Sequence, residues 1–228
     1  FWSINAIWKN KVAVLVGDYL LARGLLLAVN KKEYKQLEIV SKAVEEMSEG
    51  ELLQIEKARH LNITEETYYE VIRKKTAALM IACTTAGANS VGAGDADIDR
   101  MRLLGEYLGI AFQIRDDLFD YEVNGSFGKP AGNDLKERKI TLPLIYALQN
   151  SPACERKKMI KLLRLKTKSD ADISVLMDFV RNHNGLEYAQ KAMAGFVEKS
   201  KAILNETPDN EARQSLLDLI DYTISRKK

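Results

Sequence analysis

Residues 112–120 read FQIRDDLFD, a run in which three aspartates are surrounded by apolar side chains. On an α-helix Asp116 and Asp120 stack on one face because they lie four residues apart, and Asp117 lies about 100° further round. Like charges at such spacing cost a helix roughly 0.2–0.5 kcal/mol per pair. The flanking residues are too apolar for a fully solvated helix. The stretch therefore predicts a helix that presents carboxylates at the rim of a cavity.

The helical spacing of apolar residues extends along the chain on both sides of this stretch. Only four prolines punctuate the 228 residues, and the period-2 alternation that is typical of strands is not evident. We therefore predict an all-α protein with a single domain over residues 1–228. The predicted helices cover residues 4–29, 33–58, 64–91, 97–123, 141–150, 152–166, 170–183, 185–204 and 209–226.

Composition narrows the class of protein further. Hydrophobic residues make up 46% of the chain, and 34 basic against 32 acidic residues leave a net charge of only +2, so no basic field argues for nucleic acid. Apolar runs such as 12–16 and 25–29 are short or interrupted, and a bilayer-spanning helix needs about 20 apolar residues. We therefore expect no stable membrane insertion. The two cysteines, Cys83 and Cys154, indicate reduced thiols of a cytoplasmic protein.

The three aspartates and Gln113 form a set of oxygen donors. Gln113 precedes Asp116 by three residues and Asp117 by four, so its amide reaches the same part of the helix surface. Oxygen donors suit a hard cation, and carboxylates alone favour Mg²⁺ that keeps several waters and bridges to phosphate. The alternative is a solvated acidic face, which is the more common interpretation of an arbitrary Asp-Asp-x-x-Asp.

Residues 124–138 form the one long polar connection of the chain, and loops of this length in a compact domain are usually functional or disordered. The loop carries Lys129 among glycines, and Lys139 follows it directly. Lysine is a mobile point charge that suits phosphate. Such a loop is by itself more often a solvated connection. Its position directly after the aspartates is what favours phosphate binding.

Lys75 and Thr76 belong to a helical segment rich in small residues, which extends to residue 88. Taken alone, Lys75 would be an ordinary surface lysine. The small side chains have two interpretations, because they permit close helix packing and also leave volume for a long apolar ligand.

Five ordered motifs together resemble the trans-isoprenyl diphosphate synthase (polyprenyl synthetase) family, and they span nearly the whole chain. They are GDYLL at 17–21, GELLQ at 50–54, KKTAAL at 74–79, GIAFQIRDDLFD at 109–120, and FGKP at 127–130 with Asp134 and Leu135. The resemblance implies a helical bundle around a central cavity, Mg²⁺ as the cofactor, and a cytoplasmic homodimer. It also implies isopentenyl diphosphate and an allylic diphosphate as the substrates.

The resemblance assigns roles to individual residues. It places the metal ligands in the second aspartate-rich motif of the family: Asp116, Asp117 and Asp120. It places catalysis and substrate binding on three polar side chains: Lys75, Thr76 and Gln113. It assigns phosphate oxygens to two lysines: Lys129 and Lys139. The implied reaction ionises the allylic C–O bond, and the double bond of isopentenyl diphosphate attacks the resulting cation, so no covalent enzyme intermediate is needed.

The chain departs from the family pattern at two places. The first aspartate-rich motif should lie upstream of a segment like residues 3–8, and we expect an N-terminally incomplete synthase in which this motif is absent. If only these 228 residues exist, we predict little or no activity. Arg138 stands where the family loop has a glycine before the second lysine. The motif at 50–54 favours a medium-chain or long-chain product.

Three other functions are weighed against this one. A class I terpene cyclase uses the same ionisation, but its second metal motif typically carries Asn, Ser and Glu ligands. A non-catalytic subunit of a heteromeric prenyl synthase tends to lose its aspartates, whereas this chain retains Asp116, Asp117 and Asp120. A plain helical scaffold would not explain five coincident motifs.

Overall fold

The structure is a computed structural model that describes residues 4–60, 64–122 and 132–226, and all regular secondary structure in these ranges is helical. The predicted all-α class is confirmed. In chain order the helices are α1 (Ile4–Asn30), α2 (Tyr34–His60), α3 (Glu65–Ile72), α4 (Ala78–Ser90), α5 (Asp95–Phe119), α6 (Asn133–Lys136), α7 (Leu142–Gln149), α8 (Ala153–Leu163), α9 (Asp170–Asn182), α10 (Gly185–Asn205) and α11 (Glu211–Ser225). A π-helical turn, η1 (Arg73–Ala77), joins α3 to α4.

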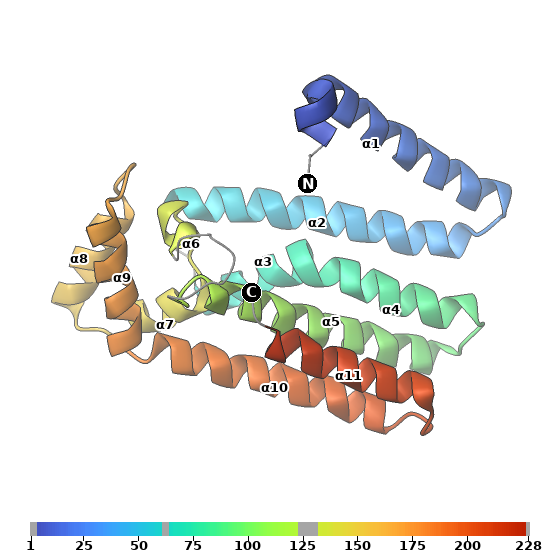
Figure 1. Cartoon of the computed structure of the whole chain (residues 1–228). Coiled ribbons are helices and arrows are strands. Elements are labelled where there is room, and N and C mark those ends of the chain that lie inside the picture. The colour runs from blue at the N-terminus through green and yellow to red at the C-terminus, as the bar shows by residue number, and fades with distance from the viewer. Residues whose placement is uncertain (1–3, 61–63, 123–131, 227–228) are drawn as a thin grey trace.

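Helix α5 lies at the centre of the fold (Figure 1). It packs against η1 and α4 on one side and against α10 and α11 on the other, and α2 covers α4. Ile110, Ile114 and Leu118 recur every four residues along α5 and are 5%, 0% and 4% exposed. Burying each such side chain contributes roughly 1.5–3 kcal/mol. This apolar face therefore fixes α5, and with it the aspartates at its end.

Two glycines bring the helices around the site unusually close together. A Cβ built on Gly109 of α5 would lie 2.6 Å from the Cβ of Ala77 in η1, and one built on Gly50 of α2 would lie 2.6 Å from the backbone nitrogen of Lys75. Real Cβ atoms do not approach so closely, because the repulsion is severe. Only glycine therefore permits α2 and α5 to flank η1 at this distance.

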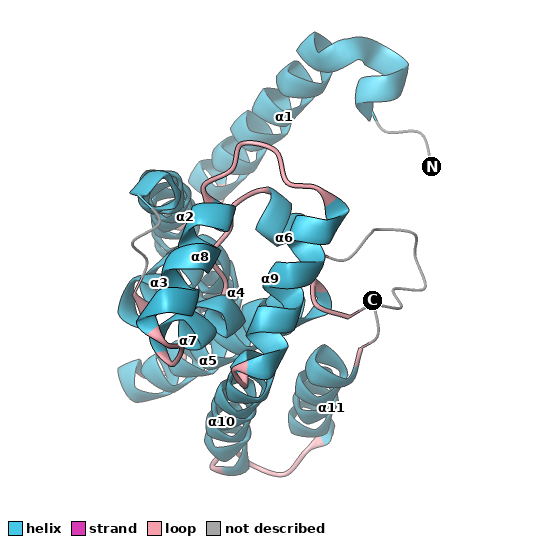
Figure 2. Cartoon of the chain, turned by 90° about the vertical axis from the view of Figure 1, so that its left-hand side faces the viewer, coloured by secondary structure: helices cyan, strands magenta, loops and turns pink. Residues whose placement is uncertain are grey.

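The short helices α7, α8 and α9 lie at one end of the bundle, the end that faces the viewer in Figure 2. Two predicted helix starts are confirmed in the structure. Thr64 caps α3, because its hydroxyl accepts a 3.3 Å hydrogen bond from the backbone amide of Thr67. Thr141 precedes α7, and Pro143 lies in the first turn of that helix, where its missing N–H costs nothing.

The structure differs from the predicted helices in three details. The helix predicted over residues 64–91 contains the π-helical turn η1, in which the backbone amide of Ala78 bonds to the carbonyl of Arg73. The region predicted as a loop contains α6. Helix α5 ends at Phe119, so Asp120 is its C-cap residue rather than part of a longer helix.

Helix α1 packs on α2 and otherwise stands apart from the bundle (Figure 2). Its residues 10–30 form one continuous segment of 21 residues with a mean hydropathy of 1.9, none of it buried. The expectation that no apolar stretch is long enough to span a membrane is therefore corrected, because Gly17 and Asp18 do not interrupt the helix. By length and composition alone this is weak support for a membrane span, since core helices of soluble proteins pass the same test.

Candidate active site

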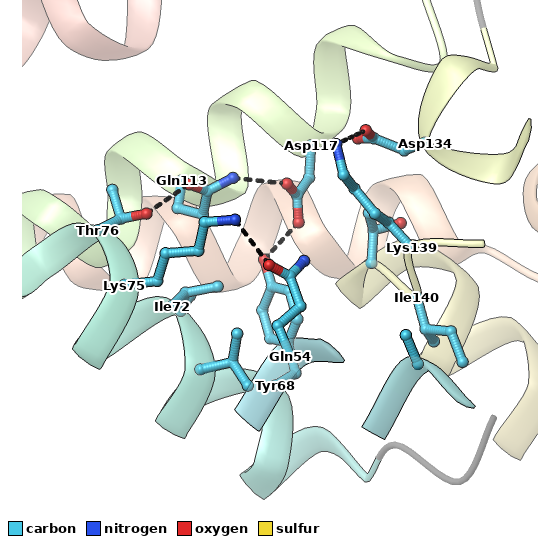
Figure 3. Close-up of a pocket in the computed structure, with 13 residues that line it drawn as sticks. Gln54, Tyr68, Ile72, Lys75, Thr76, Gln113, Asp117, Asp134, Lys139 and Ile140 are labelled. Atoms are coloured by element: carbon cyan, nitrogen blue, oxygen red, sulfur yellow. Dashed lines mark hydrogen bonds and ion pairs between the residues drawn. The ribbon is translucent and has the colours of Figure 1, made fainter. Parts of the chain in front are cut away.

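Two adjoining cavities lie where α2, η1 and α5 meet the segment around α6. The smaller one, of about 110 Å³, is shown in Figure 3. Its polar lining consists of Gln54, Tyr68, Lys75, Thr76, Gln113, Asp117, Asp134, Lys139 and Thr141. The larger one, of about 610 Å³, shares Gln113, Asp117, Asp134 and Lys139 with it. It is further lined by Asp116, Phe119, Asp120, Asn133, Glu137, Tyr222 and Arg226.

A chain of hydrogen bonds connects η1 to the aspartates of α5 (Figure 3). The hydroxyl of Thr76 donates to Gln113 Oε1 at 2.8 Å, and Gln113 Nε2 donates to Asp117 Oδ1 at 2.8 Å. The second carboxylate oxygen, Asp117 Oδ2, accepts a 2.7 Å hydrogen bond from the Tyr68 hydroxyl. We call these four residues the Asp117 relay. Each oxygen of the Asp117 carboxylate thus accepts a hydrogen bond from a neutral donor, Gln113 or Tyr68.

Asp117 is almost completely enclosed, with 6% of its surface exposed. Burial raises the pKa of this carboxyl to about 7, and two neighbouring aspartates add to the rise. The hydrogen bonds from Tyr68 and Gln113 act in the opposite direction, because they favour the charged form. Keeping this buried carboxyl charged near neutral pH costs free energy, and a bound cation or a proton offsets that cost.

Asp116 faces the larger cavity and pairs with Arg226, the residue that follows α11. The Arg226 guanidinium also lies 4.0 Å from the centre of the Phe112 ring. Its backbone carbonyl accepts a 3.1 Å hydrogen bond from Arg115. The end of the described chain is thus attached to α5 beside the aspartates.

Asp120 has a different set of partners. Its carboxylate is buried and accepts hydrogen bonds from the backbone amides of Asn133 at 2.9 Å and Asp134 at 3.0 Å, at the start of α6. Its backbone carbonyl accepts a third bond, at 2.8 Å, from the amide of Gly132. Asp120 therefore anchors the segment that follows the polar connection onto the end of α5.

The three aspartates thus do not converge on one point. Among residues 4–60, 64–122 and 132–226, no group of three or more His, Cys, Asp or Glu side chains is placed to hold a metal ion by itself. Mg²⁺ in proteins is usually held by one or two carboxylates together with substrate phosphates and waters, not by an all-protein cage. The all-oxygen donors of Asp116 and Asp117, side by side on a cavity, fit this kind of site.

The two described lysines of the predicted site both line the smaller cavity. Lys75 Nζ donates to Gln54 Oε1 at 2.7 Å and pairs with Glu51 at 2.6 Å. Lys139 Nζ pairs with Asp134 at 3.1 Å and with Glu137 at 2.8 Å. Burial lowers the pKa of Lys139, but the bonds to these two carboxylates outweigh burial and leave the pKa above its ordinary value. Both lysines are therefore placed to act as cations toward a phosphate group.

Arg138 has a left-handed backbone conformation, with φ of 61°. Glycine adopts this conformation without strain, whereas residues with a Cβ do so at a cost. The departure noted in the sequence, an arginine in place of a glycine, thus falls on a position where the backbone favours glycine. Lys129, the other lysine predicted to bind phosphate, lies outside the described residues.

Comparisons with known proteins identify the family of this chain. The family described as Polyprenyl synthetase matches residues 2–180. The chain belongs to the polyprenyl synthetase family. Membership makes it a prenyltransferase of isoprenoid biosynthesis.

Individual relatives of this family cover nearly the whole chain. Octaprenyl diphosphate synthase of Escherichia coli (strain K12) is 32% identical over 227 residues, which are 99% of this chain and 70% of that protein. The crystal structure of a decaprenyl diphosphate synthase from Rhodobacter capsulatus superimposes with a TM-score of 0.89 at 38% identity, over 98% of this chain and 69% of that one. A polyprenyl synthase from Caulobacter crescentus, crystallised with calcium and isoprenyl diphosphate, gives a TM-score of 0.87 at 35% identity, over 98% and 69%.

Sequence reasoning placed Lys75, Thr76, Gln113 and Asp117 in one site, and the structure brings them to one cavity. It missed other polar residues that line the two cavities: Gln54, Tyr68, Asp134 and Arg226. Two of these lie in motifs that carry the resemblance to the polyprenyl synthetase family, the GELLQ stretch and the Asp-Leu pair. The other two approach the aspartates only through the tertiary fold and give no local signal.

Proposed function

We propose that the chain lengthens an allylic diphosphate with five-carbon units from isopentenyl diphosphate, with Mg²⁺ bound at Asp116 and Asp117. The observation that carries this proposal is the adjacency of two kinds of surface. One is the acid-lined cavity, and the other is the pair of lysines, Lys75 and Lys139, beside it. Mg²⁺ held at the acidic cavity and the two lysines beside it would place positive charge on both sides of a diphosphate group, whose negative charge the lysines alone would not balance.

Each side chain then has a role in the reaction. Lys75 and Lys139 stabilise the negative charge that develops on the departing diphosphate as the allylic C–O bond breaks. The Thr76 hydroxyl is fixed by its bond to Gln113, and we assign it to the reacting carbons of the allylic substrate. The double bond of isopentenyl diphosphate attacks the allylic cation, and a proton then passes to the released diphosphate. Bound Mg²⁺ supplies further positive charge against the leaving group.

Asp120 has a supporting role in this proposal. Its carboxylate holds the amides at the start of α6 and so sets the position of Asp134 and, through it, Lys139. It also lines the larger cavity, to which it adds negative charge.

We assign the apolar part of the substrate to the face of α2 that continues from Glu51, which pairs with Lys75 of η1. Glu51, the ion-pair partner of Lys75, lines a surface cavity of about 490 Å³ together with Val44, Met47 and Leu52. Val44 is 53% exposed, and Val40, one turn away on the same helix, is 52% exposed. A long apolar stripe of this kind favours a long-chain product, as the names of the octaprenyl and decaprenyl relatives also suggest.

We also propose that the chain forms one synthase domain and assembles as a cytoplasmic homodimer. Large apolar residues of α1 such as Val14, Leu20 and Leu27 are exposed, and exposed apolar surface of this kind supports an interface there. Multi-angle light scattering tests this assembly. A monomer at micromolar concentration contradicts it.

The decisive experiment combines intact mass with an isopentenyl-transfer assay on the same sample, using farnesyl diphosphate and Mg²⁺. Mg²⁺-dependent elongation that Asp116→Ala abolishes supports the proposal and gives the product length. A cyclised hydrocarbon product would instead indicate a terpene cyclase. Turnover that appears only when a second subunit is added would indicate a component of a heteromeric synthase.

A further inference from the structure

Tyr68 on α3 donates to Asp117 from the side opposite to Gln113. The two residues are 49 positions apart in the chain. Tyr68 is 4% exposed, and its hydroxyl makes no other hydrogen bond within the described residues. A buried tyrosine hydroxyl that is aimed at one carboxylate oxygen therefore needs an explanation beyond packing.

The Tyr68 ring is itself rigidly placed. It belongs to the main apolar core together with Ile72 and Ile114, and it meets the Tyr69 ring edge-to-face with centroids 5.6 Å apart. A ring held in this way fixes the position of its hydroxyl. That hydroxyl in turn fixes the plane of the Asp117 carboxylate, because Gln113 already holds the other oxygen.

The hydrogen bond from Tyr68 also affects the other members of the Asp117 relay. With one hydrogen bond on each oxygen, the carboxylate of Asp117 cannot rotate without breaking a bond. The remaining lone pairs of its oxygens can serve a ligand in the cavity, because each carboxylate oxygen accepts more than one bond. Gln113 is aligned by the same arrangement, so its carbonyl stays directed at the Thr76 hydroxyl.

We propose that Tyr68 is a positioning residue, which orients Asp117 toward a bound cation. It thereby also maintains the hydrogen bonds that join Asp117 to Gln113 and Gln113 to Thr76. This inference rests on the proposed metal site at Asp116 and Asp117. Partners that orient a ligating side chain commonly change metal affinity by about 10–100-fold when they are removed.

Tyr121 offers a matched control. It is also buried, at 2% exposure, and its hydroxyl bonds to the Thr141 hydroxyl at 3.0 Å instead of to Asp117. Tyr68→Phe and Tyr121→Phe each remove one buried hydroxyl and one hydrogen bond, and each keeps the ring. A merely structural role for Tyr68 predicts similar effects from both changes.

The test measures Mg²⁺ affinity by calorimetry, with inorganic diphosphate as the probe, and the side-chain amide resonances of Gln113 by NMR in metal-free protein. We expect Tyr68→Phe to weaken Mg²⁺ binding about tenfold and to shift the Gln113 resonances. We expect Tyr121→Phe to change affinity less than about twofold at a similar loss of thermal stability. Equal Mg²⁺ affinity for Tyr68→Phe and the unmodified chain overturns the inference.

A failure of the proposed metal site gives a different result. If the unmodified chain binds no Mg²⁺ with diphosphate, the proposed function is contradicted, and the role of Tyr68 toward a cation is lost with it. The NMR measurement then decides the relay alone: unchanged Gln113 resonances in Tyr68→Phe contradict the coupling between Tyr68 and Gln113.

Discussion

Arg226 pairs with Asp116, a residue 110 positions earlier in the chain and the first aspartate of the motif on α5. The guanidinium lies over the Phe112 ring, and Arg115 holds the Arg226 backbone. The guanidinium of Arg226, the residue after α11, is thus paired with a carboxylate that the proposed metal site requires. A divalent cation at Asp116 and the Arg226 guanidinium therefore compete for the same negative charge.

The first prediction concerns this competition. Arg226→Gln removes the competing charge, so we expect the affinity for Mg²⁺ alone to rise about three- to tenfold, which corresponds to roughly 1 kcal/mol for a partly exposed ion pair. Calorimetric titration without diphosphate measures it. Arg213→Gln is the control, because Arg213 pairs with Asp209 at the other end of α11 and the substitution makes the same change in net charge. An unchanged or weaker affinity in Arg226→Gln contradicts the competition.

The second prediction concerns the cost of burying Asp117. Its pKa is raised from 3.8 to about 7 in the folded chain, so the folded state loses stability as pH rises from about 4 and bears the full penalty above about 7. Asp117→Asn removes a charge that titrates, and Gln113 can turn its amide to bond the new side chain. We expect Asp117→Asn to be more stable than the unmodified chain in EDTA. This difference in the free energy of unfolding should be about 1–3 kcal/mol larger at pH 8 than at pH 5.

Denaturant unfolding at the two pH values measures this difference. Asp178→Asn is the control, since Asp178 has a side chain that is 60% exposed and pairs with Arg181 on the surface of α9. A stability difference between Asp117→Asn and the unmodified chain that is the same at pH 5 and pH 8 would show that burial does not hold the pKa near 7.

The third prediction tests the left-handed residue before Lys139. Arg138 has φ of 61°, a conformation that costs a residue with a Cβ roughly 1–2 kcal/mol relative to glycine. Glycine also loses more conformational entropy on folding, which offsets part of this gain. We therefore expect Arg138→Gly to stabilise the fold by about 0.5–1 kcal/mol. Arg138→Ala keeps the Cβ and removes the same charge, so a matching gain in that variant would assign the effect to charge and not to the backbone.

The helices of this chain could be predicted because their signal is local. Apolar residues at three- and four-residue spacing fix which face of α5 is buried, and this is enough to place Ile110, Ile114 and Leu118 in the core. The π-helical turn at Arg73–Ala77 gives no such signal, because it adds a single residue to an otherwise continuous helix. The start of α6 escaped prediction because its residues are polar and follow glycine.

The candidate site was predictable only in part, for a related reason. Gln113 and Asp117 lie four residues apart on one helix, so their contact follows from spacing alone. The expected stacking of Asp120 on Asp116 assumed that the helix continues, whereas α5 ends at Phe119 and the Asp120 carboxylate bonds to α6. Contacts such as the one between Tyr68 and Asp117 join distant segments, and single-sequence periodicity does not contain them.

The last prediction tests whether close helix packing builds the site. Gly109→Ala places a Cβ 2.6 Å from the Cβ of Ala77 and 2.5 Å from its Cα, so α5 must move away from η1. We expect a loss of about 1–3 kcal/mol in the free energy of unfolding, because overpacking forces such shifts. The same movement lengthens the bond between Gln113 and Thr76, so binding of inorganic diphosphate with Mg²⁺ weakens as well.

Gly195→Ala provides the matched control for this change. Gly195 lies within α10, and a Cβ added there would have no neighbouring atom within 4 Å, so alanine stabilises the helix by about 0.5–1 kcal/mol and leaves the site untouched. The two substitutions add the same methyl group to a helix and are expected to change stability in opposite directions. If Gly109→Ala is as stable as Gly195→Ala and binds diphosphate normally, α5 tolerates a wider spacing from η1, and the glycine is not what aligns Gln113 with Thr76.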